Sequence, residues 1–162
     1  MRIMERSCLD DVKKKYGPLC KKYKLPGFDE LNKEFEIEKI QEHETDYILR
    51  EIRKAISEKM SAFLRFFETV LNPVMAPVFI IAALKNLENG EKQKIKEIYE
   101  AMVSVEIGTI ELDVEYSEKK EAEFIIKASK KWKSIKPDIL EIMKIIEKSH
   151  SISEKKGNSY LG

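Results

Sequence analysis

Residues 74 to 84 read Val-Met-Ala-Pro-Val-Phe-Ile-Ile-Ala-Ala-Leu and carry no charged side chain, whereas 36% of the 162-residue chain is charged. A helix that is apolar on every side has to be covered on every side, by its own domain or by another chain. The stretch is shorter than the roughly 20 apolar residues that span a bilayer. It therefore predicts either the central helix of an all-helical domain or a surface that a partner covers.

Apolar residues recur at helical spacing on both sides of this stretch, which predicts two long helices. The first runs from about 46 to 71, with an apolar stripe of Ile48, Ile52, Ile56, Met60, Phe63, Phe67 and Val70. The second runs from about 91 to 116, and its inward positions are Ile95, Ile98, Met102, Val105 or Val103, Ile107, Ile110 and Val114. Because residues 103 to 110 are rich in β-branched side chains, a short strand stays open there as an alternative to helix.

Shorter segments complete an all-α pattern. The first 24 residues form a short amphipathic element that Leu25-Pro26-Gly27 ends, and a short helix follows from residue 28 to 35. Ser117 caps a helix from about 118 to 134, and Pro137 begins the last one. We predict a single-domain helical bundle over residues 1 to 149, with about five main helices around residues 77 to 88 and a short N-terminal helical element. Residues 150 to 162 lack apolar periodicity and predict a disordered C-terminal tail.

The composition indicates a cytoplasmic protein. The N-terminal residues lack the apolar core of a secretory signal, and no apolar stretch is long enough to cross a membrane. Cys8 and Cys20 have no second cysteine pair near them, so we interpret them as reduced thiols, with a redox pair as the alternative. Lys and Arg number 30 and Asp and Glu number 29, which leaves a formal net charge of +1.

Both signs of charge are abundant while Asn and Gln together number seven, a balance that is typical of proteins from organisms that live at high temperature. The sequence Glu-Leu-Asp-Val-Glu-Tyr at residues 111 to 116, followed by Glu-Lys-Lys-Glu-Ala-Glu-Phe-Ile and then Trp132, resembles small, uncharacterised all-helical proteins of thermophilic archaea. The resemblance extends over residues 25 to 148 and implies no particular activity.

One histidine has the spacing of a metal ligand. Glu147-x-x-His150 matches half of a di-iron site in a helical bundle, which needs a second such motif. The other histidine, His43, has Ile40 three residues before it, so the second motif does not exist. We interpret Glu147 and His150 as polar residues at a helix end.

Four carboxylates lie close together in the sequence near residue 113, and one interpretation of them is an acid/base cluster. Glu111, Glu115 and Glu118 fall on one helical face with Asp113 nearby, but Glu115 and Lys119 have the spacing of an exposed ion pair. General acid or base catalysis needs a carboxylate held away from water. The six glycines also form no phosphate-binding loop. We therefore predict no catalytic residues, no metal site and no cofactor, and expect a protein that is not an enzyme.

Lysines gather on one side of the helix expected at 118 to 134. At about 100° per residue, five of them share an arc of roughly 120°, and this lysine stripe consists of Lys119, Lys120, Lys127, Lys130 and Lys131. Glu123 interrupts the stripe, and Trp132 lies on the opposite, apolar arc, where we expect it in the core. Such a stripe is either a solvated face or a track for the phosphates of a nucleic acid.

These patterns favour a non-enzymatic interaction or scaffold protein that binds itself or another macromolecule. The candidate interface is the apolar stretch, with Val78, Phe79 and Ile81, together with Phe66, Phe67 and Leu71 just before it. Its surplus of large apolar residues favours a protein partner or a homodimer over a monomer. The alternative is an RNA- or ribosome-associated factor that uses the lysine stripe.

Overall fold

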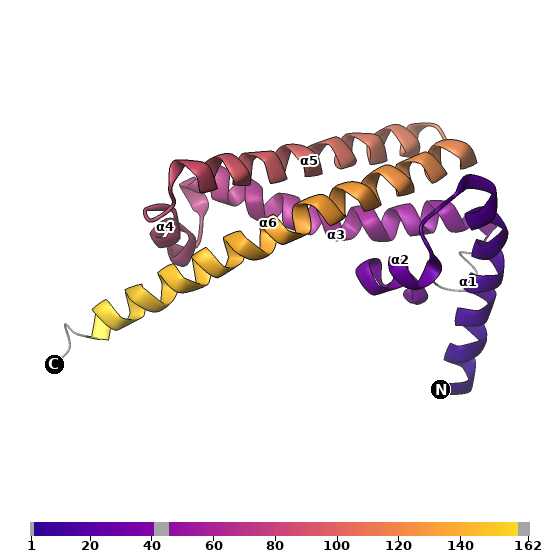
Figure 1. Cartoon of the computed structure of the whole chain (residues 1–162), viewed down its shortest axis with the longest axis horizontal. Helices are drawn as coiled ribbons and strands as arrows, with labels where there is room; N and C mark the ends of the chain where they lie inside the picture. Colours follow the sequence, from indigo (N-terminus) through magenta and orange to yellow (C-terminus); the bar gives the residue numbers. More distant parts are fainter. Residues whose placement is uncertain (1, 41–45, 159–162) are drawn as a thin grey trace. The chain divides into compact units, whose positions relative to one another are not determined.

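The computed structural model describes residues 2 to 40 and 46 to 158, and the side chains of residues 9 to 40 and 46 to 152 (Figure 1). Every regular element in these ranges is helical, which confirms the all-α class. The α-helices are α1 (Arg2–Tyr23), α2 (Phe28–Phe35), α3 (Ile48–Leu71), α4 (Val78–Leu84), α5 (Asn89–Val114) and α6 (Glu118–Asn158). The 3-10 helices are η1 (Ile37–Lys39) and η3 (Pro73–Met75).

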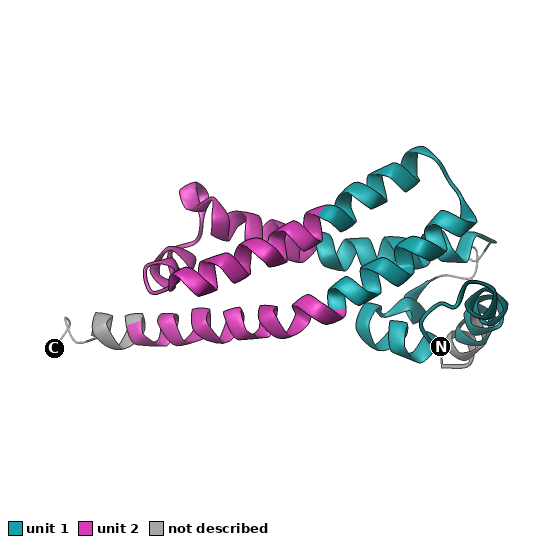
Figure 2. Cartoon of the chain, turned by 45° about the horizontal axis from the view of Figure 1, so that its top comes forward, with its two compact units in different colours: residues 1–61, 104–132 teal, residues 62–103, 133–162 magenta. Residues whose placement is uncertain are grey.

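The helices form two compact units, which Figure 2 colours separately. Unit 1 comprises residues 1 to 61 and 104 to 132, and unit 2 comprises residues 62 to 103 and 133 to 162. Helices α1 and α2 belong to unit 1 and α4 belongs to unit 2, whereas α3, α5 and α6 each contribute residues to both.

The core of unit 1 contains the apolar faces that the sequence predicts for its helices. Tyr16 of α1 is buried, and its hydroxyl donates a hydrogen bond of 2.5 Å to the carbonyl of Pro26, just after α1 ends. The amide of Lys120 donates to Ser117 Oγ at 3.4 Å, so Ser117 caps α6 as expected. The other buried apolar side chains include Leu31, Phe35, Ile48, Ile52, Ile56, Ala122, Ile125, Ala128 and Trp132.

The core of unit 2 gathers apolar side chains from four helices. Phe67 at the end of α3 is fully buried, and Ile80 and Ala83 are the buried residues of α4. Helix α5 buries Ile95, Ile98 and Met102, and α6 buries Ile135, Ile139, Ile142 and Ile146.

Helix α4 is not the central element that its composition predicts. Pro73 and Pro77 divide the uncharged stretch, because proline lacks the amide that a continuing helix needs, so α4 has only seven residues. At about 1.5 Å per residue it is roughly 10 Å long, too short to be the core of a bundle. None of the η3 residues is buried. The expectation of a central helix is therefore wrong.

Helix α6 continues through two positions where the sequence predicts an end. Pro137 lies inside the helix rather than at the start of a new one. An interior proline costs roughly 3 kcal/mol, and the buried isoleucines on both sides of it, Ile135 and Ile139, offset that cost. The helix also passes residue 149 and ends at Asn158. Residues 159 to 162 of the expected tail lie outside the described residues.

Helix α5 resolves the choice between helix and strand at residues 103 to 110 in favour of helix. Val105 is buried, as one of the two expected alternatives, but beyond it the inward face differs from the expected one, because Ile107, Ile110 and Val114 are exposed while Leu112 is buried. Met102, Val105 and Leu112 keep one helical face, and Ile107, Ile110 and Val114 lie off that face. No helix in the described part of the chain is both long and apolar enough to cross a membrane.

Candidate interaction surfaces

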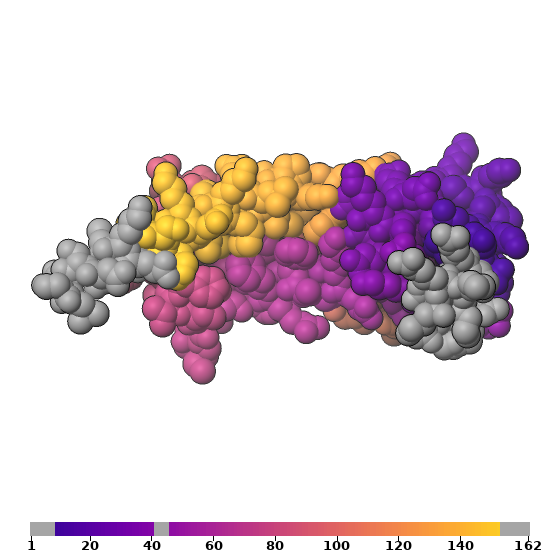
Figure 3. Space-filling model, turned by 90° about the horizontal axis from the view of Figure 1, so that it is seen from below, coloured from indigo at the N-terminus to yellow at the C-terminus, as the bar shows by residue number. Residues whose placement is uncertain are grey.

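Unit 2 carries a neutral patch of apolar side chains exposed to water. It consists of Leu71, Val74, Met75, Val78, Phe79 and Ile81. Met75 is 92% exposed and Val74 and Val78 are each 82% exposed. In Figure 3 the pink region around α4 stands out from the surface of unit 2. Residues 69 to 84 contain no charged side chain, so the patch is electrically neutral over its whole length.

The structure separates the six residues that the sequence assigns to a partner interface. Leu71, Val78, Phe79 and Ile81 all lie in the neutral patch. Phe67 is fully buried and Phe66 is half-buried, and their rings pack edge to face with centroids 5.2 Å apart. Phe66 and Phe67 therefore do not belong to the neutral patch, whereas Val74 and Met75 of the apolar stretch do.

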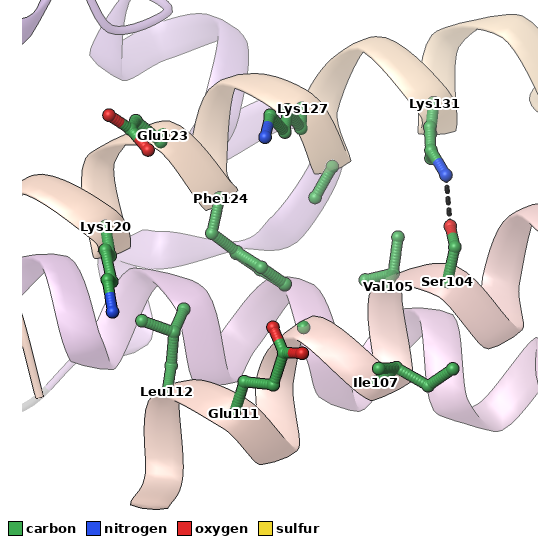
Figure 4. Close-up of a pocket in the computed structure, with 12 residues that line it drawn as sticks. Ser104, Val105, Ile107, Glu111, Leu112, Lys120, Glu123, Phe124, Lys127 and Lys131 are labelled. Atoms are coloured by element: carbon green, nitrogen blue, oxygen red, sulfur yellow. Dashed lines mark hydrogen bonds between the residues drawn. The ribbon is translucent and has the colours of Figure 1, made fainter. Parts of the chain in front are cut away.

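Unit 1 carries a groove between α5 and α6, with a volume of about 420 Å³ (Figure 4). From α5 it is lined by Ser104, Val105, Ile107, Gly108, Glu111 and Leu112. From α6 it is lined by Lys120, Glu123, Phe124, Lys127, Ala128 and Lys131. Phe124 reaches from α6 towards α5 in Figure 4, and a Cβ atom at Gly108 would lie 3.3 Å from its ring. Glycine at 108 thus lets the two helices approach closely enough to form the groove floor.

The lysine stripe lies on the side of α6 opposite its buried arc, as predicted. Lys119, Lys120, Lys127 and Lys130 are exposed, while Lys131 is half-buried and donates a hydrogen bond to Ser104 Oγ. The structure divides the stripe, because Lys120, Lys127 and Lys131 line the groove and the other two do not. Trp132 is in the core, as expected from its place on the apolar arc.

The carboxylates near residue 113 do not form one cluster. Asp113 accepts a hydrogen bond from Arg53 at 2.7 Å, and Glu118 accepts from Lys22 at 3.0 Å and from Tyr23 at 2.6 Å. The Tyr23 and Lys22 bonds lower the pKa of Glu118. Asp113 and Glu118 thus have separate structural partners.

Glu115 completes this division. It pairs with Lys120 at 3.7 Å and not with Lys119. The reason is that Glu115 follows the end of α5 and precedes α6, so the expected helical spacing does not apply. The remaining acidic residue, Glu111, faces the groove (Figure 4).

Sequence reasoning missed a buried ion pair in unit 1. Arg53 and Glu121 both have fully buried side chains, and Arg53 Nε donates to Glu121 Oε2 at 2.7 Å. Burial raises the pKa of Glu121, although the hydrogen bond from Arg53 opposes that shift. The other oxygen of Glu121 has no hydrogen-bond partner in the described part of the chain. The only sequence signal was an arginine next to the apolar stripe of α3.

The described side chains of the histidine and cysteine motifs each have their own surroundings. His150 is exposed and packs edge to face on Phe79, with ring centroids 6.4 Å apart. His43 and the side chain of Cys8 lie outside the described residues, and Cys20 is a free thiol. Among the residues that the structure describes, no group of three or more His, Cys, Asp or Glu could hold a metal ion.

No family model, curated protein or solved structure matches this chain. The two candidate interaction surfaces are the neutral patch of unit 2 and the groove of unit 1.

Proposed function

We propose that this protein is a non-enzymatic, cytoplasmic helical-bundle protein that acts as an interaction or scaffold module, and that it forms a homodimer through the neutral patch. The observation that carries the proposal is the exposure of six large apolar side chains within eleven consecutive residues. Scattered apolar residues are normal on a protein surface, whereas a contiguous patch of this size marks an interaction site.

The area of the neutral patch supports a second copy of the chain as the partner. Six large residues that are 39% to 92% exposed leave a patch on the scale of a few hundred Å², a substantial part of the roughly 800 Å² that each partner contributes to a standard interface. In a two-fold dimer the same patch on both copies forms the interface, so the areas match by symmetry.

The charge of the neutral patch supports the same partner. Two neutral patches bring no like charges together and remove no charge from water, which is the main electrostatic cost of an interface. A strongly charged partner would find no counter-charge between Glu68 and Lys85.

Sedimentation equilibrium at increasing protein concentration tests the dimer. The wild type should reach twice the monomer mass of 18.9 kDa in the micromolar range. The double variant Met75→Lys/Val78→Lys should dissociate at least about tenfold more readily, which corresponds to 1.4 kcal/mol. Its helicity and urea midpoint should match those of the monomeric wild type, because both side chains are exposed.

Leu140→Lys is the matched control, because Leu140 is an exposed apolar residue of unit 2 outside the neutral patch. It should leave the dimer unchanged. A wild type that remains monomeric throughout the micromolar range would reject the homodimer.

A second candidate function is RNA binding by the lysine stripe, favoured by the exposure of four of its five lysines on one face of α6. Three to five phosphate contacts predict that log affinity falls against log salt with a slope of roughly 2 to 3.5 for single strands. Lys127→Glu/Lys130→Glu/Lys131→Glu should weaken binding to a mixed RNA and flatten the slope.

The matched control replaces three exposed lysines of unit 2 that are not in the stripe, Lys92, Lys144 and Lys148. This control carries the same change in net charge, so equal losses in the two variants would show that the stripe has no special role.

A further inference from the structure

The floor of the groove between α5 and α6 is apolar, as a site that binds a helix requires. Val105, Leu112, Phe124 and Ala128 are buried beneath it, and Ile107 at its rim is 53% exposed. The lining residues extend from 104 to 112 on α5 and from 120 to 131 on α6, lengths of roughly 12 to 17 Å at 1.5 Å per residue. A groove of this length accommodates two to three turns of a third helix, whose side chains pack as a ridge between the two helices.

The two walls of the groove differ in charge. The charged residue on the α5 wall is Glu111, and residues 97 to 118 contain seven carboxylates and no Lys or Arg. The α6 wall contributes Lys120, Lys127 and Lys131. Figure 4 shows Glu123, the acidic residue of that wall, directed away from Glu111.

Two of these wall charges are available to a ligand. In the described part of the chain, Glu111 and Lys127 take part in no ion pair, although they lie on facing walls of one groove. Lys120 and Lys131 have contacts of their own, with Glu115 and Ser104. Glu111 and Lys127 are therefore the groups that a bound segment would pair with first.

We propose that this groove binds an amphipathic helix of a partner protein, with an apolar stripe that has basic residues along one edge and acidic residues along the other. The apolar stripe covers the floor around Phe124, the basic edge faces Glu111, and the acidic edge faces Lys127. Helices bound in grooves use apolar anchors at three- and four-residue spacing in this way.

Charge favours this occupant over a nucleic acid or a second copy of the groove. A nucleic acid would place phosphates against Glu111 as well as against the lysines. A second copy presents another groove rather than a ridge, so the two floors would not meet. The site lies in unit 1 and does not depend on the neutral patch of unit 2.

The charge difference between the walls also fixes the direction of the bound helix. Turning the helix end for end exchanges its two edges, which would place its basic edge against Lys127 and its acidic edge against Glu111. One direction is therefore preferred.

Three synthetic helical peptides with the same leucine stripe test the proposal by fluorescence anisotropy. The first has lysine on one edge and glutamate on the other, the second has lysine on both edges, and the third has glutamate on both. We expect the mixed-edge peptide to bind the full-length protein about two- to fivefold more tightly than either of the others, as surface charge pairs allow.

Single substitutions then assign the binding to the groove. Glu111→Lys should reverse the preference so that the glutamate-edged peptide binds best. Ile107→Glu should weaken the mixed-edge peptide by about fivefold or more, because it removes an apolar rim contact and puts a charge where the leucine stripe would have to displace its water. Leu140→Glu is the matched control, since Leu140 is 55% exposed and lies outside the groove.

Several outcomes would overturn the proposal. They are equal binding of all three peptides, an equal effect of Ile107→Glu and Leu140→Glu, and no binding at all. A further contradicting result would be that Glu111→Lys strengthens the binding of the glutamate-edged peptide and of a mixed RNA equally, while the wild type binds neither of them in preference to the other. The groove would then respond only to positive charge. In the Met75→Lys/Val78→Lys variant, which should not dimerise through the neutral patch, sedimentation of the complex at a mass above one chain plus one peptide would show a second copy at the groove in place of the peptide.

Discussion

Each unit has one feature that costs free energy in the isolated chain, a buried ion pair in unit 1 and an exposed, uncharged apolar patch in unit 2. Unit 1 removes an arginine and a glutamate from water, because Arg53 and Glu121 are fully buried against each other. Unit 2 leaves apolar side chains in water, and Met75 is 92% exposed. A buried ion pair costs desolvation and tolerates little displacement, so it fixes how α3 meets α6 within unit 1. An exposed apolar patch contributes little to the fold of its own chain, and its energetic value appears when a partner covers it.

The largest effect should come from breaking the buried pair of unit 1. Arg53→Ala leaves the Glu121 carboxylate buried without its cation, and the loss of one partner of a buried pair costs about 3 to 5 kcal/mol. Urea unfolding followed by circular dichroism measures this as a fall in the free energy of unfolding.

The double variant Arg53→Met/Glu121→Leu distinguishes the cost of an unpaired buried charge from the cost of lost packing. Apolar side chains of similar volume often replace a buried pair at little cost, so the double variant should be more stable than Arg53→Ala. A double variant as unstable as the single one would show that packing, and not the unpaired charge, causes the loss.

In unit 2 the matching contrast is between two phenylalanines twelve residues apart. Phe67 is fully buried, and Phe67→Ala should lower the free energy of unfolding by about 3 to 5 kcal/mol. Phe79 is 41% exposed in the neutral patch, and Phe79→Ala should cost the monomer clearly less while weakening the dimer. Similar losses of monomer stability in both variants would contradict the division between core and patch.

The smallest effect concerns an exposed contact in unit 1. The hydrogen bonds from Tyr23 and Lys22 lower the pKa of Glu118 below its unfolded value. A lowered folded pKa contributes stability above the unfolded pKa, and that contribution is lost as the pH falls through the folded pKa. Glu118→Gln should therefore be less stable than the wild type at pH 7, and the difference should shrink below about pH 4. A difference independent of pH would show that the charge of Glu118 does not matter.

The sequence predicted helices well because helical periodicity is local. The apolar stripe of α3, the break at Leu25-Pro26-Gly27 and the cap at Ser117 all depend on residues within a few positions of each other. Pro137 was misread because its local cost is outweighed by the burial of isoleucines along α6. Propensity alone does not contain that tertiary contribution.

The candidate surfaces were predicted less completely, because exposure depends on contacts between distant segments. The composition of residues 74 to 84 was consistent with a core or an interface, and the positions of Pro73 and Pro77 decided against the core. The groove could not be found at all, since it requires Gly108 to lie against Phe124. Likewise, the pairing of Arg53 with Glu121 joins residues 68 apart in the sequence.

Pulsed dipolar spectroscopy with one nitroxide per chain tests the central claim that a second copy covers the neutral patch. The label is attached at Met75→Cys in a Cys8→Ser/Cys20→Ser background, and a second sample carries it at Leu140→Cys. We predict an intermolecular distance at position 75 that is shorter than that at position 140 and that disappears on dilution with unlabelled protein. The absence of intermolecular coupling at position 75, or a shorter distance at position 140, would contradict the account.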